Sequence, residues 1–344
     1  MLVRTFGVSV LLTAAGLVAA LLYDGPKALF VTAILVVLEV SLSFDNAVVN
    51  ARVLERMSAY WQRLFLTVGM VVAVFGMRLV FPLLVVGVTA HLSPWRAWRL
   101  ALERGDPDTP GSYGYLLHDA HPAIAAFGGI FLLMIFLDFL IDEHKQLHWL
   151  DPVERLIQRA GLLRWASELI ALVALVGFTL VYRHHTVEVL VSGVAGLASY
   201  LLVNGAAHRF QGSGENGGAA GAVVATGKAA FWLFVYLQVL DASFSFDGVI
   251  GAFAITSDPV VIALGLGIGA LYVRSLTVLL VRRGTLGRLV FLEHGAHWAI
   301  GALAVLLLVS IEHEVPEVVT GLIGVGFIGA ALVSSLRRNR LHPA

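Results

Sequence analysis

Two copies of one short acidic motif lie inside long apolar stretches of the chain. Both read acid-x-Ser-x-Ser-Phe-Asp, and they are Glu39-Val-Ser-Leu-Ser-Phe-Asp45-Asn46 and Asp241-Ala-Ser-Phe-Ser-Phe-Asp247-Gly248. An ionised Asp at the centre of a membrane helix costs about 2.5 to 3.5 kcal/mol on insertion scales. The four carboxylates of Glu39, Asp45, Asp241 and Asp247 therefore need partners within the membrane.

Two arginines, Arg78 and Arg274, each lie in the apolar stretch that follows one motif. They can neutralise only two of the four acids, so protons or a bound cation must balance the rest, and two leftover carboxylates suit a divalent ion. Carboxylate, Asn and Ser oxygens favour Mg²⁺, Ca²⁺ or Mn²⁺, while nearby imidazoles shift the preference toward Mn²⁺ or another transition metal such as Zn²⁺. The alternative is that each arginine forms a purely structural buried pair with one acid.

The spacing within a motif limits what its two acids can share. Residues six apart on an ideal helix differ by about 240° in direction. Glu39, Ser43 and Asn46 share one face, whereas Asp45 points elsewhere. Both acids of a motif can bind one ion only if the helix unwinds or faces a cavity on two sides, and the paired serines favour such bending. Otherwise one acid binds the ion and the other pairs with an arginine.

Two His-x-x-His pairs come at the start of a later apolar stretch in each half of the chain. They are His118-Asp-Ala-His121 and His294-Gly-Ala-His297. These imidazoles, with Ser43 and Ser245, are candidate accessory ligands or an entrance site for a cation. Imidazoles at a membrane interface are also ordinary, so a structural or interfacial role is the alternative.

Acidic motif, arginine and His pair recur in the same order, which predicts a duplicated unit of three helices. The first unit covers about 28–141 and the second about 224–311. Their motif helices are five spans apart and must cross in opposite directions, as in inverted-topology repeats. Transporters with such repeats bind substrate near the midplane, at the interface between the repeats.

The composition predicts one all-α polytopic membrane domain over residues 1–344. Hydrophobic residues make up 58% of the chain and charged residues 13%, against about 25% in soluble domains. A span needs about 20 apolar residues. We expect ten spans, or nine if one terminal segment does not cross: 5–22, 28–50, 64–89, 122–141, 166–182, 186–204, 224–254, 260–281, 294–311 and 316–336.

The composition distinguishes polar segments from the spans and excludes some kinds of site. Residues 91–117 form a polar insertion, and a Gly-rich linker within 205–223 separates helices 166–204 from the second unit. The seventh segment is long for one straight crossing, so it is broken or tilted. The absence of cysteine from the sequence excludes disulfides and thiolate metal sites. A formal net charge of zero indicates no nucleic-acid partner.

Basic residues predict the orientation of the bundle, since cytoplasmic loops are rich in Lys and Arg. The cluster Arg337, Arg338 and Arg340 indicates a cytoplasmic C-terminus in the cell (inner) membrane, and ten spans then place the N-terminus there too. One loop disagrees, because Arg96, Arg99 and Arg104 fall outside. A homo-oligomer is compatible with the sequence.

The first motif resembles the acid-x-x-Leu-Ser-x-Asp-Asn signature of TerC-type membrane proteins, and the motif at Asp241 is similar to the other motif of that family. The resemblance covers about residues 28–311 and indicates an uncharacterised, DUF-labelled branch within the LysE-like transporter superfamily. It implies metal-ion handling, notably manganese export, with a tellurium-resistance name inherited from early members. It also implies an ion-binding set made of Glu39, Asp45, Asn46, Asp241 and Asp247. Three features depart from the family pattern, namely Gly248 in place of a Ser, the His pairs and the 91–117 insertion.

We therefore expect a transporter that exports a divalent cation, most simply Mn²⁺, with no catalytic residues. Two other functions remain open. An intramembrane metal-dependent hydrolase would use the His pairs and an acid for zinc, although no His-Glu-x-x-His motif occurs. A membrane partner for the assembly or metallation of exported proteins would bind a protein and move no ion.

Overall fold

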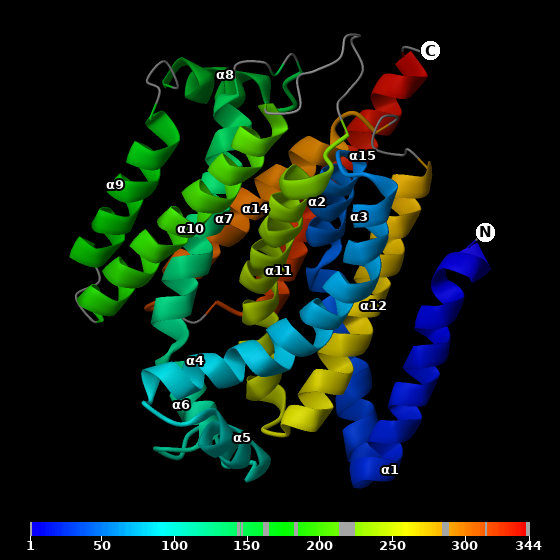
Figure 1. Cartoon of the computed structure of the whole chain (residues 1–344), viewed down its shortest axis with the longest axis vertical. Coiled ribbons are helices and arrows are strands. Elements are labelled where there is room, and N and C mark those ends of the chain that lie inside the picture. The colour runs from blue at the N-terminus through cyan, green and yellow to red at the C-terminus, as the bar shows by residue number, and fades with distance from the viewer. Residues whose placement is uncertain are drawn as a thin grey trace.

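The computed structural model describes residues 2–142, 145, 147–160, 165–181, 185–212, 224–283, 289–313 and 315–341, with the side chain of Asp247 among those left outside the description. These residues form helices and no β-sheet (Figure 1). The elements are α1 (Leu2–Leu42), α2 (Phe44–Glu55), α3 (Ala59–Leu64), the π-helical η1 (Phe65–Gly69) and η2 (Val72–Val80), α4 (Phe81–Thr89), α5 (Pro94–Leu102), α6 (Tyr113–Asp119), α7 (His121–Ile141), α8 (Asp151–Ala160), α9 (Ala166–Val181), α10 (Thr186–Gly212), α11 (Gly227–Ile255), α12 (Pro259–Arg283), α14 (Leu292–Val309) and α15 (Glu317–Leu341).

Eight helices in the described part of the chain are long and apolar enough to cross a membrane, which confirms the all-α membrane class. One of them, α1, is two arms joined at Asp24 and Gly25, and Gly25 has a positive φ of 74° that only glycine adopts readily. Figure 1 shows the two arms running in opposite directions. With α9, a shorter apolar helix of 16 residues, the arms bring the crossings to the expected ten.

The two predicted three-helix units run in opposite directions through the bundle. In Figure 1 the second arm of α1 with α2 ascends, the helix from α3 to α4 descends, and α7 ascends. The matching helices α11, α12 and α14 descend, ascend and descend. Both chain termini lie toward the same end of the bundle, as an even number of crossings requires. We call this the termini end.

The structure corrects the expectation for one span and narrows it for another. The span expected at 28–50 is interrupted at Ser43, whose backbone leaves the helical region at φ −100° and ψ 18°. The chain then continues as α2 to Glu55. The seventh segment, expected to be broken or tilted, is the continuous helix α11 of 29 residues, so the first of these two alternatives is excluded. At 1.5 Å per residue it is longer than the roughly 30 Å hydrocarbon core, which leaves tilting or protrusion to accommodate it.

The packing around α12 positions the first acidic motif. Both arms of α1 contact α12. On one side of α12, a hydrogen bond of 2.8 Å joins Ser275 Oγ to Ser9 Oγ of the first arm. On the other side Gly269 lies against Glu39, and a Cβ at this glycine would collide with the Glu39 side chain. Close approach of a helix bearing a small residue is the usual way membrane helices pack. Here it brings a carboxylate next to the second repeat unit.

Large apolar side chains face outward on the peripheral helices. Leu22 is 81% exposed and Leu11 70% on the first arm of α1, and Val191 is 63% exposed on α10. By contrast, α7 is buried along most of its length between α10, α11 and α14. A continuous apolar exterior fits lipid rather than water as the surrounding solvent.

Candidate functional site

The interruption at Ser43 separates the first motif into two helix ends. Glu39 lies in the last turn of α1, and Asp45 and Asn46 lie in the first turn of α2. All three side chains are at most 5% exposed. Asp45 Oδ1 accepts a hydrogen bond of 2.9 Å from the Asn46 backbone N–H, and the positive end of the α2 dipole favours a carboxylate there.

One guanidinium connects acids from both motifs. Arg78, buried on η2, donates from Nη2 to Glu39 Oε1, and its Nη1 lies 3.9 Å from Asp241 Oδ2. The same Nη1 donates to the Ala73 carbonyl at 2.7 Å. Acids of oppositely directed helices therefore meet at a single arginine.

Two polar side chains complete this network. Asn46 Nδ2 donates to Asp241 Oδ1 at 2.8 Å, which joins α2 to α11. Ser43 Oγ donates to Glu39 Oε1 at 3.0 Å. Residue Gly248 of α11 also lies beside this acid, because a Cβ there would be 3.1 Å from Glu39 Oε2. The glycine that departs from the family pattern thus leaves room for the glutamate.

Asp45 points away from this network, as its helical position predicts. Its Oδ2 faces α15, where a Cβ on Gly324 would lie 3.8 Å away. Among the described side chains no basic group pairs with Asp45. Ser245 is buried, and its Oγ has no hydrogen-bond partner among the described residues. The remaining expected ligand, Asp247, has its side chain outside the described residues.

The second arginine has a different environment from the first. Arg274 is half-buried on α12 and donates from Nε to the Leu66 carbonyl at 2.7 Å. It forms no ion pair with an acid within the residues described. Among the described side chains, Arg78 is the one of the two expected charge-balancing arginines that pairs with acids.

A small cavity of about 20 Å³ adjoins the network. Besides Arg78, Asp241 and Arg274, its polar lining comes from Asn50, Gln238 and Thr277. Sequence reasoning missed these last three residues because each is a single uncharged polar side chain in an apolar helix. The signal that could have found them is spacing, since Asn50 follows Asn46 by one turn and Gln238 precedes Asp241 by nearly one turn.

The first His pair lies at the end of the bundle opposite the termini end, where α6 meets α7 (Figure 1). His118 is exposed, and its ring centroid is 6.3 Å from that of His121. His121 Nε2 lies 3.4 Å from Ser310 Oγ. This pair contacts none of the motif acids through the interactions described.

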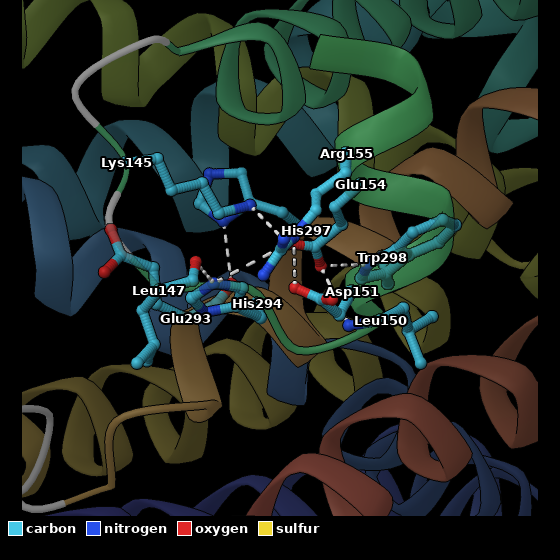
Figure 2. Close-up of polar contacts among 10 residues, drawn as sticks. All are labelled: Lys145, Leu147, Leu150, Asp151, Glu154, Arg155, Glu293, His294, His297 and Trp298. Carbon is cyan, nitrogen blue, oxygen red and sulfur yellow. Dashed lines mark hydrogen bonds and ion pairs between the residues drawn. The ribbon is translucent and has the colours of Figure 1, made fainter. Parts of the chain in front are cut away.

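The second His pair lies at the opposite end, among residues of the α7–α8 connection (Figure 2). His294 Nε2 lies 2.8 Å from the Leu147 carbonyl, and His297 Nδ1 lies 2.8 Å from the Glu293 carbonyl. Nearby, Lys145 Nζ and Glu154 Oε2 form a buried ion pair of 2.9 Å.

Hydrogen bonds hold this ion pair in place. Glu154 Oε1 accepts a 3.1 Å bond from Trp298 Nε1, and its Oε2 is 4.0 Å from His294 Nε2. Burial alone would raise the pKa of Glu154, but the ion pair with Lys145 and the Trp298 bond outweigh it and hold the pKa below its usual value. Burial lowers the pKa of Lys145. These contacts form a junction between α8 and α14 at the termini end of the bundle.

The expected ligands are therefore not gathered in one place. Glu39, Asn46, Asp241 and Ser43 come together around Arg78, Asp45 points away toward α15, and the two His pairs lie at opposite ends of the bundle. Within the described residues no group of three or more His, Asp or Glu side chains is placed to hold a metal ion. The guanidinium of Arg78 stands between the acids that would have to share one.

The sequence comparisons identify a family without an assigned activity. A family model described as "Protein of unknown function (DUF475)" matches residues 44–342, which include Asp45 and the whole second motif. No curated protein matches the chain. No solved structure matches it. Neither the TerC-type resemblance nor a metal substrate is tested by these matches.

Proposed function

We propose that this chain, which belongs to the DUF475 family, is a membrane transporter that exports a divalent cation, with Mn²⁺ as the favoured substrate. One observation carries the proposal: Glu39 and Asp241, from oppositely directed helices, converge on Arg78. Transporters with inverted repeats bind ions at this kind of interface. The TerC-type resemblance of the motifs supports the same class.

The balance of buried charge supports a cation rather than an anion. The described site holds three buried acids, Glu39, Asp45 and Asp241, against the buried Arg78 and the half-buried Arg274. Two guanidiniums cannot neutralise three carboxylates, so protons or a substrate cation must carry the remaining positive charge. The ligand atoms are carboxylate, amide and hydroxyl oxygens, which suit a hard divalent ion.

Arg78 would act as an internal counter-ion that competes with the substrate. Without substrate it holds Glu39 and Asp241 together. A divalent cation approaching these carboxylates would displace the guanidinium, which would then rely on the Ala73 carbonyl it already contacts. Loss of the cation on the other side of the membrane returns the guanidinium, and protons are the natural counter-flux for this exchange.

In the proposed orientation the termini end of the bundle faces the cytoplasm of the cell (inner) membrane. That end carries the Arg52–Glu293 pair, Lys145 and the C-terminal arginines. Of the three arginines that disagree with this orientation, Arg96, Arg99 and Arg104, the last is paired with acids: Asp258 Oδ2 lies at 3.0 Å and Asp24 Oδ2 at 3.6 Å.

The hydrolase alternative gains nothing from this geometry. Its zinc site required imidazoles and an acid together. The two His pairs occupy opposite ends of the bundle (Figure 1), and the acid beside the second pair, Glu154, is paired with Lys145. An assembly or metallation partner would show stable capture of a protein with no ion flux.

The test is Mn²⁺ flux into liposomes that contain the purified full chain, together with the metal content and metal sensitivity of cells that express it. We expect Asp45→Asn and Asp241→Asn to abolish flux and lower metal tolerance. Asp138→Asn is the matched control, because Asp138 lies in a span but bonds to Tyr200 on α10 at 2.6 Å, outside the network. Unchanged flux and tolerance for every divalent metal tried, in both acid variants, would sink the proposal.

A further inference from the structure

Three residues that line the cavity beside Asp241 carry buried oxygen atoms without a hydrogen-bond partner among the described residues. They are Asn50 Oδ1, Gln238 Oε1 and Asp241 Oδ2, and the last of these lies 3.9 Å from Arg78 Nη1 in an ion pair. Their side chains are 4%, 8% and 7% exposed. A buried acceptor without a partner costs roughly 1 to 3 kcal/mol, so these oxygen atoms favour an occupant that donates hydrogen bonds or carries positive charge. Arg78 Nε is an unpartnered donor on the same lining.

The cavity lies on one side of the acid network, toward the termini end of the bundle. Asn50 follows Asn46 by one turn along α2, and Gln238 precedes Asp241 by nearly one turn along α11. Because α2 and α11 run in opposite directions, both steps lead to the same end. An ion arriving from that end therefore meets these neutral oxygens, together with the Arg274 side chain that also lines the cavity, before it meets the carboxylates.

The inverted repeat allows a comparison with the equivalent positions on the other side. The motif alignment pairs Asn50 with Ala252 and Gln238 with Val36, and both partners are buried apolar residues. Aligning the two arginines likewise pairs Thr277 with Phe81. The polar lining thus exists on one side only, although the acids and arginines are duplicated. A purely structural need of the duplicated fold would not break the symmetry in this way.

We propose that Asn50 and Gln238 form a neutral-oxygen antechamber in which a divalent cation exchanges part of its water shell before it reaches Asp241. The proposal rests on the proposed function, since it concerns the path to the same acids. Asp241 is suited to the transfer: Asn46 holds its Oδ1, and its Oδ2 lines the cavity without a hydrogen bond.

The size and chemistry of the cavity fit this role. About 20 Å³ holds roughly one water-sized particle, so a cation must shed water to enter. Amide oxygens are ordinary ligands for hard divalent ions, and their neutrality keeps the binding weak enough for the ion to move on. Arg78, which also lines the cavity, stands between this antechamber and Glu39.

The experiment measures Mn²⁺ affinity of the full chain in lipid nanodiscs, by loss of the free Mn²⁺ paramagnetic resonance signal, and Mn²⁺ flux in liposomes. We expect Asn50→Leu and Gln238→Leu each to raise the Kd about tenfold or more and to raise the KM for flux. Asn50→Asp should lower the Kd, because it adds a charge to the same oxygen position. Asn204→Leu, which removes a membrane amide on α10, should leave the Kd unchanged.

The opposite effects of Asn50→Leu and Asn50→Asp keep the test independent of folding, since a merely damaged protein binds less in both cases. If the Kd and KM are unchanged in both leucine variants while Asp241→Asn abolishes binding, the cavity holds water only. The antechamber is then wrong and the proposed function stands. If Asp45→Asn and Asp241→Asn also leave binding and flux unchanged, the proposed function itself fails.

Discussion

Arg78 and Glu39 form an ion pair in which each side chain is 2% exposed, between two helices of the same repeat unit. Such a pair contributes little net stability, because removing two charges from water costs about as much as their attraction returns. Its significance is that neither charge can be left alone. Any step that takes Arg78 away from Glu39 requires a proton or another cation on the carboxylate. In the proposed function this requirement ties movement of the arginine to binding of the substrate.

The first prediction concerns removal of this arginine. Arg78→Leu leaves Glu39 and Asp241 buried without a counter-ion, and we expect a loss of about 3 to 5 kcal/mol in the free energy of unfolding. Millimolar Mn²⁺ should restore more stability to the variant than it adds to the unmodified protein, because the competing guanidinium is absent. Thermal unfolding in detergent, with and without Mn²⁺, measures both effects.

A double variant supplies the control for this prediction. Arg78→Leu combined with Glu39→Gln removes both charges, so a substantial part of the lost stability should return without metal. Equal stabilisation of Arg78→Leu and the unmodified chain by Mn²⁺ would contradict competition between the arginine and the ion.

The second prediction concerns the close contact between α12 and the second arm of α1. A methyl group at Gly269 would collide with Cβ and Cγ of Glu39, so Gly269→Ala must push the two helices apart or move the carboxylate. We expect a loss of about 1 to 3 kcal/mol in stability and reduced Mn²⁺ flux. Gly326→Ala is the matched control on α15, where a Cβ meets no atom within 4 Å.

The control should be neutral or slightly stabilising, since Ala has a higher helix propensity than Gly. If both glycine variants behave alike in unfolding and in flux, the contact at Gly269 does not position Glu39.

The membrane class and the crossing number could be predicted because long apolar runs leave a chain few alternatives to spanning helices. The opposite directions of the two units followed from counting spans between matched motifs. The separation of the two His pairs was predictable by the same logic, because equivalent positions of an inverted repeat lie at opposite ends of the bundle. Accessory ligands drawn from both pairs could therefore not meet at one ion.

Other features depend on packing that a single sequence does not display. Two serines in a motif are compatible with either a bent or a straight helix, and the chain breaks at Ser43 but continues through the equivalent Ser245. The cavity could not be predicted, because Asn50 and Gln238 are distant in sequence and meet only through the antiparallel placement of α2 and α11. Whether an arginine reaches an acid likewise depended on geometry, as the contrast between Arg78 and Arg274 shows.

The last prediction concerns the junction between α8 and α14 and its dependence on pH (Figure 2). The pKa of Glu154 lies below its ordinary value of 4.5 in the folded protein, so its contribution to stability is present above that value. It is lost as the pH falls through the lower folded pKa, because protons then bind the unfolded state more readily. We therefore expect stability to fall in acid below about pH 4.5, and this part of the fall to be absent in Glu154→Gln.

At neutral pH the same variant leaves Lys145 buried without its acid, which should cost about 3 to 5 kcal/mol. Because burial lowers the pKa of Lys145, raising the pH should neutralise the amine and recover stability in Glu154→Gln. The neighbouring pair of Arg155 and Asp151 is exposed, so Asp151→Asn should change stability by less than about 1 kcal/mol. Unfolding measured across pH in all three proteins decides the matter: a Glu154→Gln curve parallel to that of the unmodified chain would show that the ion pair does not hold α8 against α14.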